Sequence, residues 1–440
     1  MKRMKLFKSL IATMLIVLLL PTNIVANAQG NNGQIQNIIA NYAIVMDMDT
    51  GEVIASKNAE KKVPVASTIK LLTSLIFAEN TSKNEEIPFT ADALKTTQTS
   101  MNNFKKIKVG DKISSNDLMK AVLIYSANDC AYVMADSVAG NTKDFVKMMN
   151  DRVKELGLKD TTIVNPCGLE SDALNPDNKE INISTAYDMA IIASEAYKNE
   201  RIREIISDKY EKTSVDLSGS PVIIETRNKI LNQNGNTGGK TGNETKAGHC
   251  FVGFFERDGR NLVTVALKSQ YGVDGTNVFN DTNTIANTGY DAKKQVYKKA
   301  NEELQSIELE YKAFGLFGPK KTIKAPIIAL EDVTYYKNDI NDKNIKVEYN
   351  TENKSAWKLA GDEVNMTLSM LNHKSQIVGK VDISIFDLIK SNILVYAITI
   401  LGLVAILFLI AFVMKFINSK KRRNRRSIMG KKKKYKMYIK

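Results

Sequence analysis

The sequence predicts an α+β fold, in which an antiparallel sheet is flanked by helices and a helical lobe, followed by a small β domain and a C-terminal transmembrane helix. Three observations support this prediction. Hairpin patterns lie at 43–55 and 250–267, with mostly helical patterns between them. Short β-prone runs follow from about residue 299, and an uncharged apolar stretch occupies 393–414. Strands at both ends of a mostly helical region favour one sheet built by both chain ends.

The elements of the first region follow in order along the chain. A hairpin of 43–46 and 53–55 is followed by helices at 68–79, 116–125, 130–138, 142–156 and 185–197, and by a second hairpin of 250–255 and 262–267. The composition then becomes Lys-rich, with β-prone runs at 323–330, 333–336, 345–349, 364–371 and 377–383. We therefore expect a first domain at 29–298 and a small β-rich domain at 299–390.

The net charge of the chain is concentrated at its two ends. The 440 residues include 62 Lys and Arg against 48 Asp and Glu, a formal charge of +14. Residues 1–28 hold four of the basic residues and 415–440 hold thirteen, whereas neither segment holds an acidic residue. The middle keeps 45 basic and 48 acidic residues, a balance of −3 that argues against a nucleic-acid partner. A hydrophobic content of 43% excludes general disorder.

Residues 1–28 have the pattern of a secretory signal peptide. Basic residues come first, an apolar stretch follows at 10–20, and Pro21 ends it before the small residues Ala26-Asn27-Ala28. The apolar stretch is too short to span a bilayer comfortably, and the small residues resemble a cleavage site. We expect cleavage after Ala28.

Residues 393–414 predict a transmembrane helix. The stretch has no charged residue and about the length of ~20 residues that a bilayer core requires. The basic residues of 415–440 mark the cytoplasmic side, and they offer contacts to anionic lipid headgroups. A tail that binds nucleic acid is the alternative, although a stop-transfer flank needs only this composition. We expect the protein in the cell membrane, with 29–392 on the extracytoplasmic side.

The cysteines and histidines give little support to a metal site. Cys130, Cys167 and Cys250 are an odd number and widely spaced, unlike a disulfide scaffold, so we expect buried thiols. The only histidines are His249 and His373, and there is no zinc-ligand spacing. With only two histidines, a Ser-His-Asp catalytic triad is also poorly supported. We expect no metal and no cofactor.

The first candidate for chemistry is Ser67, which stands at the start of an apolar helix with Lys70 one turn further on the same face. The free backbone N–H groups of a helix start stabilise an anion at Ser67. Lys70 can accept the hydroxyl proton where burial or another cation lowers its pKa. The same Ser-x-x-Lys spacing recurs at Ser355 and Lys358, where the simpler interpretation is that the serine caps a helix and the lysine is solvated.

Two further short motifs carry polar residues in unusual settings. Ser126 and Asn128 lie at the junction of two apolar helices, which predicts that they are held rigidly at the interior edge of the helical lobe. Lys240-Thr241-Gly242 precedes the β-run at 250–255, and we expect it on an edge strand. Because glycine has no side chain, Gly242 would leave room there for a substrate backbone. The residues before it superficially match a phosphate-binding loop, but Asn234 occupies the position of its first glycine.

Together and in order, these three motifs resemble the penicillin-recognising serine acyltransferases. The closer resemblance is to the low-molecular-weight penicillin-binding proteins, the serine-type D-alanyl-D-alanine carboxypeptidases of peptidase family S11, and it covers about residues 35–298. Further matching stretches are Asn165-Pro166-Cys167-Gly168-Leu169, 184–190 and Ala247-Gly248-His249-Cys250. The resemblance implies a DD-peptidase/β-lactamase-like fold for 29–298.

The resemblance also implies a role for each residue of the motifs. Ser67 would attack the peptide bond between two terminal D-alanines of a peptidoglycan stem peptide, with Lys70 as its base. Ser126 would relay a proton to the leaving amine. Substrate binding would fall to the following residues: Asn128, Lys240, Thr241, Gly242 and Asn243. The oxyanion hole would be the backbone N–H groups of Ser67 and Asn243. β-Lactams would acylate Ser67, and each of the two lysines would lower the pKa of the other.

The sequence departs from the family at one position. Many relatives carry an arginine where Val278 precedes Phe279-Asn280-Asp281, so it is in doubt whether an arginine binds the substrate carboxylate here.

Three further functions remain to be considered. The first is a β-lactamase, which would need Glu-x-x-x-Asn, but Glu170 and Asn175 are one residue too far apart. The second is a DD-endopeptidase of the same fold, and the third is a non-catalytic wall-binding membrane protein.

Overall fold

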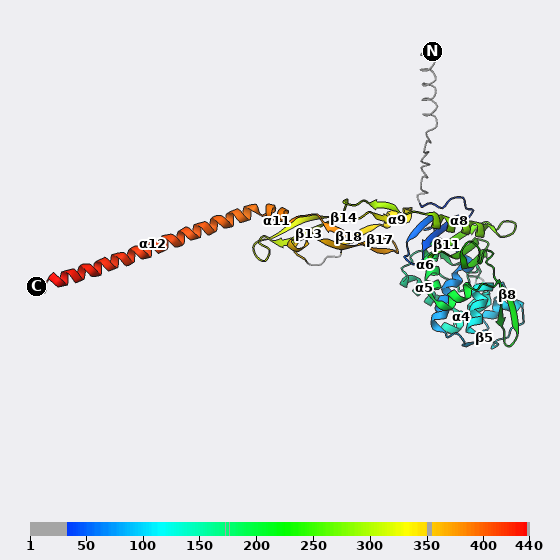
Figure 1. The fold of residues 1–440 in the computed structure, drawn as a ribbon. Helices are drawn as coiled ribbons and strands as arrows, with labels where there is room; N and C mark the ends of the chain where they lie inside the picture. The colour runs from blue at the N-terminus through cyan, green and yellow to red at the C-terminus, as the bar shows by residue number, and fades with distance from the viewer. Residues whose placement is uncertain (1–32, 172, 176, 350–353, 438–440) are drawn as a thin grey trace, which may run out of the picture. The chain divides into compact units, whose positions relative to one another are not determined.

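The computed structural model describes residues 33–171, 173–175, 177–349 and 354–437, and it divides into two compact units (Figure 1). The first unit comprises Met1–Lys294 and Tyr336–Lys343, and the second comprises Gln295–Tyr335 and Asn344–Lys440. The predicted signal peptide lies outside the described residues.

The first unit is built on a five-stranded antiparallel sheet in the order β2-β1-β11-β10-β9. Its strands are β1 (Tyr42–Asp47), β2 (Val53–Lys57), β9 (Asn236–Glu244), β10 (Gly248–Arg257) and β11 (Arg260–Ser269). β1 from the start of the unit pairs with β11 from its end, with Ile44 opposite Val265. The prediction of one sheet that the two chain ends complete is therefore confirmed. β9 is left as an edge strand.

Both faces of this sheet are buried, because the strands alternate between two hydrophobic clusters. On β1, Ala43 and Val45 face one cluster, whereas Ile44 and Met46 face the other. The first face is covered by α8 (Asn277–Asp291), and the second by the helical lobe. Sheet and lobe therefore share one continuous core.

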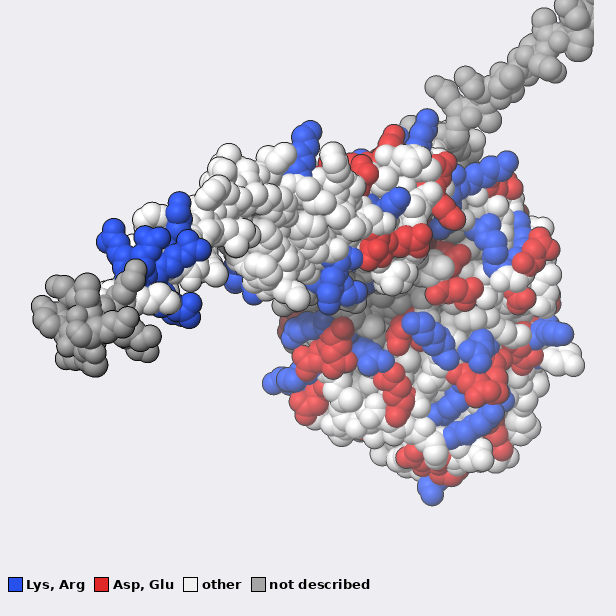
Figure 2. Space-filling model, turned by 60° about the vertical axis from the view of Figure 1, so that its left-hand side comes forward, with Lys and Arg blue, Asp and Glu red and all other residues white. Residues whose placement is uncertain are grey.

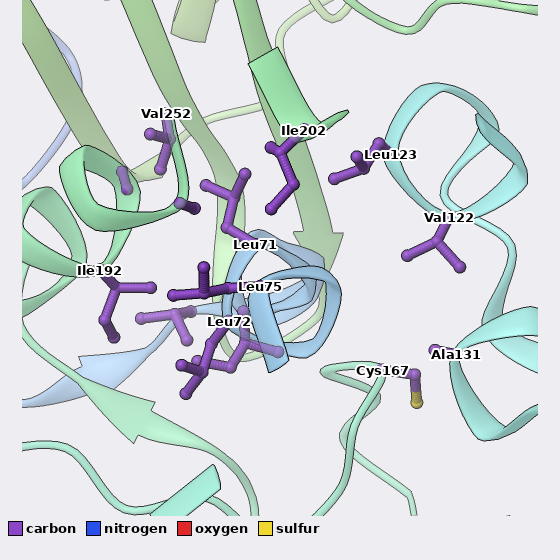
Figure 3. Packing of buried hydrophobic residues seen from close by; sticks show 14 of the residues in the cluster. Leu71, Leu72, Leu75, Val122, Leu123, Ala131, Cys167, Ile192, Ile202 and Val252 are labelled. Carbon is purple, nitrogen blue, oxygen red and sulfur yellow. The ribbon is translucent and has the colours of Figure 1, made fainter. Parts of the chain in front are cut away.

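The helical lobe surrounds α2 (Lys70–Asn80), which is buried along most of its length. Figure 3 shows Leu71, Leu72 and Leu75 of this helix pointing into the core, and side chains of other elements complete the cluster: Ile192, Ile202 and Val252. The remaining helices of the lobe are η1 (Ala66–Ile69), α3 (Ser115–Lys120), the π-helical turn η4 (Ala121–Tyr125), α4 (Asn128–Ala139), α5 (Thr142–Glu155), α6 (Ala186–Lys198) and α7 (Glu200–Ile206). The predicted helices are confirmed to within a few residues.

Short elements close the edges of the lobe. Two-stranded pairs are formed by β3 (Val63–Pro64) with β6 (Ile183–Ser184), β4 (Glu86–Pro88) with β5 (Lys112–Ser114), and β7 (Lys212–Asp216) with β8 (Pro221–Glu225). Two 3₁₀ turns, η2 (Ala93–Lys95) and η3 (Met101–Asn103), lie in the loop between β4 and β5. That loop reaches the functional site.

The segment Tyr336–Lys343 returns to the first unit and packs on its first hairpin. The amides of Asn338 and Asn341 donate to the Val53 carbonyl over 2.9 and 2.8 Å. Glu52, which is 1% exposed, pairs with Lys294 and accepts the Tyr336 amide. Buried polar groups are thereby satisfied at this contact.

The second unit contains a five-stranded antiparallel sheet in the order β13-β14-β18-β17-β16 and a β12-β15 pair, which confirms a small β domain. The strands are β12 (Gln295–Lys298), β13 (Glu303–Lys312), β14 (Lys320–Ala329), β15 (Val333–Tyr335), β16 (Lys346–Tyr349), β17 (Glu363–Ser369) and β18 (Lys374–Val381). The helices are α9 (Asp339–Asn344), shared between the two units, α10 (Ala356–Leu359), α11 (Ile385–Ser391) and α12 (Ile393–Met437).

Helix α12 contains the predicted apolar stretch. By length and composition, Ile393–Lys431 could cross a membrane, and its apolar window is fully exposed. Figure 2 shows a mostly white surface on this helix and a cluster of blue Lys and Arg side chains toward its end. This arrangement is typical of a membrane span with a basic flank.

Candidate active site

Ser67 lies in the short helix η1, which leads directly into the buried helix α2. Ala66 just before it has a φ of 48°, a left-handed conformation that costs a non-glycine residue free energy. Gly168 packs directly against this turn, and a Cβ at Gly168 would lie 2.1 Å from the Ala66 carbonyl oxygen. The backbone around Ser67 is therefore fixed by close packing.

Lys70 is completely buried and contacts Ser67 directly. Its Nζ donates to Ser67 Oγ over 2.7 Å, to Asn128 Oδ1 over 2.6 Å and to the Cys167 carbonyl over 2.7 Å. These acceptors account for the three protons of an ammonium group. Loss of one proton would leave a lone pair facing Ser67, as a general base requires.

Burial lowers the pKa of Lys70 to about 8, because the interior disfavours its charged form. The charge of Arg227 contributes to this lowering, whereas Cys167, Glu244 and Asp129 act in the opposite direction. Burial also holds the pKa of Lys240 well below its ordinary value, with smaller effects of Lys70 and Arg227. Lys70 thus lowers the pKa of Lys240, as expected, but Lys240 is not among the main causes of the shift at Lys70, and desolvation is the largest cause for both lysines.

Ser126 and Asn128 lie at the predicted junction between helices. Ser126 ends the π-helical turn η4 with a φ of 72°, and Asn128 is the first residue of α4. Besides accepting from Lys70, Asn128 donates through Nδ2 to the Gln98 carbonyl over 2.7 Å. The polar pair is held from both sides in the interior of the lobe.

Strand β9 brings Lys240, Thr241 and Gly242 to the same place. Lys240 is 1% exposed, and its Nζ donates to Ser126 Oγ over 2.8 Å. A Cβ on Gly242 would lie 3.0 Å from the Ser67 backbone nitrogen, so this strand runs closely past the start of η1. Asn243, the next residue, pairs with His249 of β10.

A cavity of about 490 Å³ opens over these groups. Six of the predicted residues line it: Ser67, Ser126, Asn128, Thr241, Gly242 and Asn243. Lys70 and Lys240 are buried and hydrogen-bond to the two serines that line this cavity. The three sequence motifs, far apart in the chain, are therefore joined in one place.

Several cavity residues were missed by the sequence prediction, among them Gln98, Thr99, Arg227, Lys229, Glu244 and Tyr271. None of them belongs to a recognisable motif, because they reach the cavity through loops or strand ends. His249 belongs to the matching stretch 247–250 but was given no role, and it lines the cavity and stacks on Tyr271 at 5.0 Å between ring centroids.

Arg227 is an exposed cation at the wall of the cavity. Its guanidinium lies 5.0 Å from the ring centroid of Tyr125, the residue just before Ser126. Val278, the position at which the resemblance led us to expect an arginine, is completely buried against the sheet. A positive group near the cavity is thus supplied from a different loop.

The described residues contain no group of three or more His, Cys, Asp or Glu side chains arranged to hold a metal ion. The three cysteines are all buried and free, as predicted. Burial raises the pKa of the Cys167 thiol, so this thiol beside Lys70 is kept protonated.

Comparison with known proteins gives consistent matches over the first unit. The family model of the peptidase S11 D-alanyl-D-alanine carboxypeptidases matches residues 27–270. D-alanyl-D-alanine carboxypeptidase DacF of Bacillus subtilis is 29% identical over 266 residues, which cover 59% of this chain and 66% of that protein. The match thus spans just under two thirds of the length of DacF.

Two solved structures are similar in fold. Penicillin-binding protein D2 of Listeria monocytogenes, in its ampicillin-bound form, has 28% identity and a TM-score of 0.51, and covers 58% of this chain and 99% of its own. DacD from Francisella tularensis has 21% identity and a TM-score of 0.55. Its match covers 80% of this chain and 95% of its own, so the similarity of fold extends into the second unit.

Proposed function

Because the chain belongs to the peptidase S11 family of D-alanyl-D-alanine carboxypeptidases, we propose that it removes the terminal D-alanine from peptidoglycan stem peptides through an acyl-enzyme on Ser67. The observation that carries the proposal is the 2.7 Å contact between the buried Lys70 amine and Ser67 Oγ, beside the Lys240–Ser126 pair. The same nucleophile would open the ring of a β-lactam and stay acylated.

In the first step, Ser67 Oγ attacks the carbonyl carbon of the penultimate D-alanine. Neutral Lys70 takes the hydroxyl proton as the new C–O bond forms. The negative carbonyl oxygen is stabilised by the backbone N–H groups of Ser67 and Asn243, and a donor of this kind contributes about 10²–10³ in rate. The close approach of Gly242 to the Ser67 nitrogen supports this placement.

Collapse of the intermediate breaks the C–N bond and releases D-alanine. Its amine needs one proton, which Ser126 Oγ donates and regains from Lys240. The proton that Lys70 took from Ser67 then replaces the one that Lys240 gave up, so Lys70 is neutral again. The 2.8 Å hydrogen bond from Lys240 to Ser126 supports this relay. Water then attacks the acyl-enzyme, the C–O bond to Ser67 breaks, and a proton returns to Ser67 Oγ.

Substrate recognition needs a positive site for the terminal carboxylate and a partner for the peptide amide. Thr241 donates its hydroxyl to the carboxylate in a field to which buried Lys240 contributes, and Asn128 orients both Lys70 and the substrate amide. Arg227 adds a positive charge at the cavity wall, which the buried Val278 cannot supply.

We also propose that α12 holds the protein in the cell membrane, with the first unit on the extracytoplasmic side. The apolar length of the helix and its basic flank support this arrangement. The stem peptide lies outside the cytoplasm, so the substrate and the cavity would share a compartment.

The activity is tested by incubating the protein with a pentapeptide that ends in D-Ala-D-Ala and measuring released D-alanine. Release that is lost in Ser67→Ala supports the proposal. Hydrolysis of a β-lactam without D-alanine release would favour a β-lactamase, and cleavage of a cross-linked dimer alone would favour an endopeptidase. Inactivity in all three assays would favour a non-catalytic protein.

A further inference from the structure

The turn between β13 and β14, residues 313–319, carries large apolar side chains into solvent. Leu316 is 89% exposed and Phe317 is 67% exposed. Phe314 and Phe317 stack with ring centroids 5.1 Å apart, so the turn presents a preformed apolar tip. We call residues 313–319 the hairpin tip. Such a group of exposed apolar side chains is typical of an interaction surface.

The hairpin tip is attached to the first turns of the apolar helix α12. Tyr396 donates its hydroxyl to the Ala313 carbonyl over 2.6 Å, and its ring centroid lies 5.1 Å from that of Phe314. Just before α12, Asn392 donates to the Tyr311 hydroxyl over 3.1 Å. The tip and the start of the helix therefore form one structure.

This attachment fixes the depth of the tip relative to the apolar stretch 393–414. Tyr396 lies three residues inside that stretch, which corresponds to about 5 Å along a helix. A tyrosine at this depth is typical of the boundary between headgroups and acyl chains. Side chains packed against Tyr396 must lie at a similar depth.

The polar groups of the turn also suit this position. Within the turn, Ala313 N donates to the Pro319 carbonyl and Phe314 N to the Phe317 carbonyl, so these backbone groups are satisfied internally, as lipid requires. Lys320 follows at the start of β14, where an ammonium group would meet lipid phosphates, and the next residue, Lys321, donates to the Ser391 carbonyl over 3.1 Å.

A second apolar face lies beside the same helix start. On α11, Ile385, Phe386 and Ile389 are 55%, 69% and 42% exposed, whereas Leu388 is buried in the core of the β domain. The helix thus turns apolar side chains outward on the residues that lead into α12. Two separate elements expose apolar groups at the point where the chain would enter the membrane.

We propose that the hairpin tip inserts into the outer boundary of the same bilayer that α12 crosses, where it binds the region between lipid headgroups and acyl chains. The inference rests on the proposed membrane topology of α12. It adds a second contact to the bilayer, made by the β domain itself, so that this domain is held at the membrane surface by more than a single helix.

The test uses the full chain in vesicles of phosphatidylethanolamine and phosphatidylglycerol whose acyl chains carry bromine near the headgroup. Trp357 is the only tryptophan, so Trp357→Phe gives a background for single reporters. The reporters are Phe317→Trp or Leu316→Trp at the tip, Ile398→Trp near the outer end of the helix, and Leu371→Trp as the matched control. Leu371 is 48% exposed, at the opposite end of the sheet and more than about 30 Å along the strands from the tip.

We expect bromine to quench most of the fluorescence of the tip and helix reporters and to leave the Leu371→Trp reporter unchanged. Circular dichroism and limited proteolysis of each variant, compared with the wild type, confirm that the β domain is folded. A quenched helix reporter with unquenched reporters at both tip positions would overturn the insertion of the tip. An unquenched helix reporter would overturn the topology on which the inference rests, without affecting the proposed reaction.

Discussion

Lys240 Nζ donates a 2.8 Å hydrogen bond to Ser126 Oγ, and this contact joins the edge strand of the sheet to the helical lobe inside the cavity. Both groups are at least nine-tenths buried, so the hydroxyl has a fixed partner. Ser67 has an equivalent partner in Lys70. The site therefore consists of two lysine–serine pairs, one suited to the nucleophile and the other to proton delivery.

Ser126→Ala is expected to slow turnover about 10²–10⁴-fold, because the leaving amine loses its proton donor. The fold should be kept, since the change removes a single oxygen atom. The measurement is D-alanine release in the steady state. Ser355→Ala serves as the control at the other Ser-x-x-Lys sequence, and activity that falls equally in both variants would contradict the assigned role.

The rate of acylation should rise with pH and level off above about 8, the pKa to which burial brings Lys70. The rate should rise with pH because only neutral Lys70 accepts the Ser67 proton. Each pH unit below this pKa should therefore lower the acylation rate about tenfold. The measurement is the rate of reaction with a fluorescent penicillin between pH 5 and 10. Lys70→Arg keeps the charge and should be inactive throughout, whereas a flat profile for the wild type would exclude Lys70 as the base.

Arg227→Ala should weaken recognition of the substrate carboxylate. A charge-assisted hydrogen bond is worth about 1.5–3 kcal/mol, which corresponds to roughly 10–150-fold in kcat/KM. The comparison pairs a free peptide acid with the same peptide amidated at its C-terminus. The variant should lose rate on the acid and little on the amide, and Arg227→Lys should recover part of the loss. An equal loss on both substrates would count against carboxylate binding.

Gly168→Ala should misplace Ser67, because the new methyl group would lie 2.1 Å from the Ala66 carbonyl. Gly157→Ala is the matched control, since its φ is also positive at 73° but nothing lies within 4 Å of the added group. The control should lose only the ~1 kcal/mol of an unfavourable φ and keep its acylation rate. Urea unfolding and penicillin acylation measure the two effects, and equal behaviour of the two variants would contradict the packing argument.

Asp129, next to Asn128, holds the loop that follows Gln98 and Thr99 in place. It accepts hydrogen bonds from Ser100 Oγ over 2.6 Å and from the Met101 amide over 3.1 Å, and burial raises the pKa of its carboxyl group. Asp129→Ala leaves these donors without a partner, so the free energy of unfolding should fall by about 1–3 kcal/mol each. Unfolding in urea measures the loss. Asp144→Ala on the exposed face of α5 is the comparison, and an equal small effect of both changes would refute the supporting role.

Local patterns were sufficient to predict much of the fold and the central residues of the site. The start of a buried helix at Ser67 and Lys70, and the alternation that buries Lys240 and Gly242, are properties of neighbouring residues. Arg227 and the segment Tyr336–Lys343 could not be predicted in this way. Their places depend on contacts such as Arg227 with Tyr125 and Asn338 with Val53, which join residues far apart in the chain.

The causes of the lysine pKa shifts also depend on contacts between distant parts of the chain. The sequence allowed either burial or a second cation to lower the pKa of Lys70, and complete burial is the larger effect. Burial is set by the packing of α2, the 165–169 loop and β9 together. No single motif carries that information.

Ser67 is assigned as the nucleophile, and intact mass after incubation with benzylpenicillin tests this assignment. The wild type should gain one penicilloyl group, mapped by proteolysis to the peptide that contains Ser67, and Ser67→Ala should gain none. Acylation of the Ser67→Ala protein, or an adduct on any other residue of the wild type, would contradict the account.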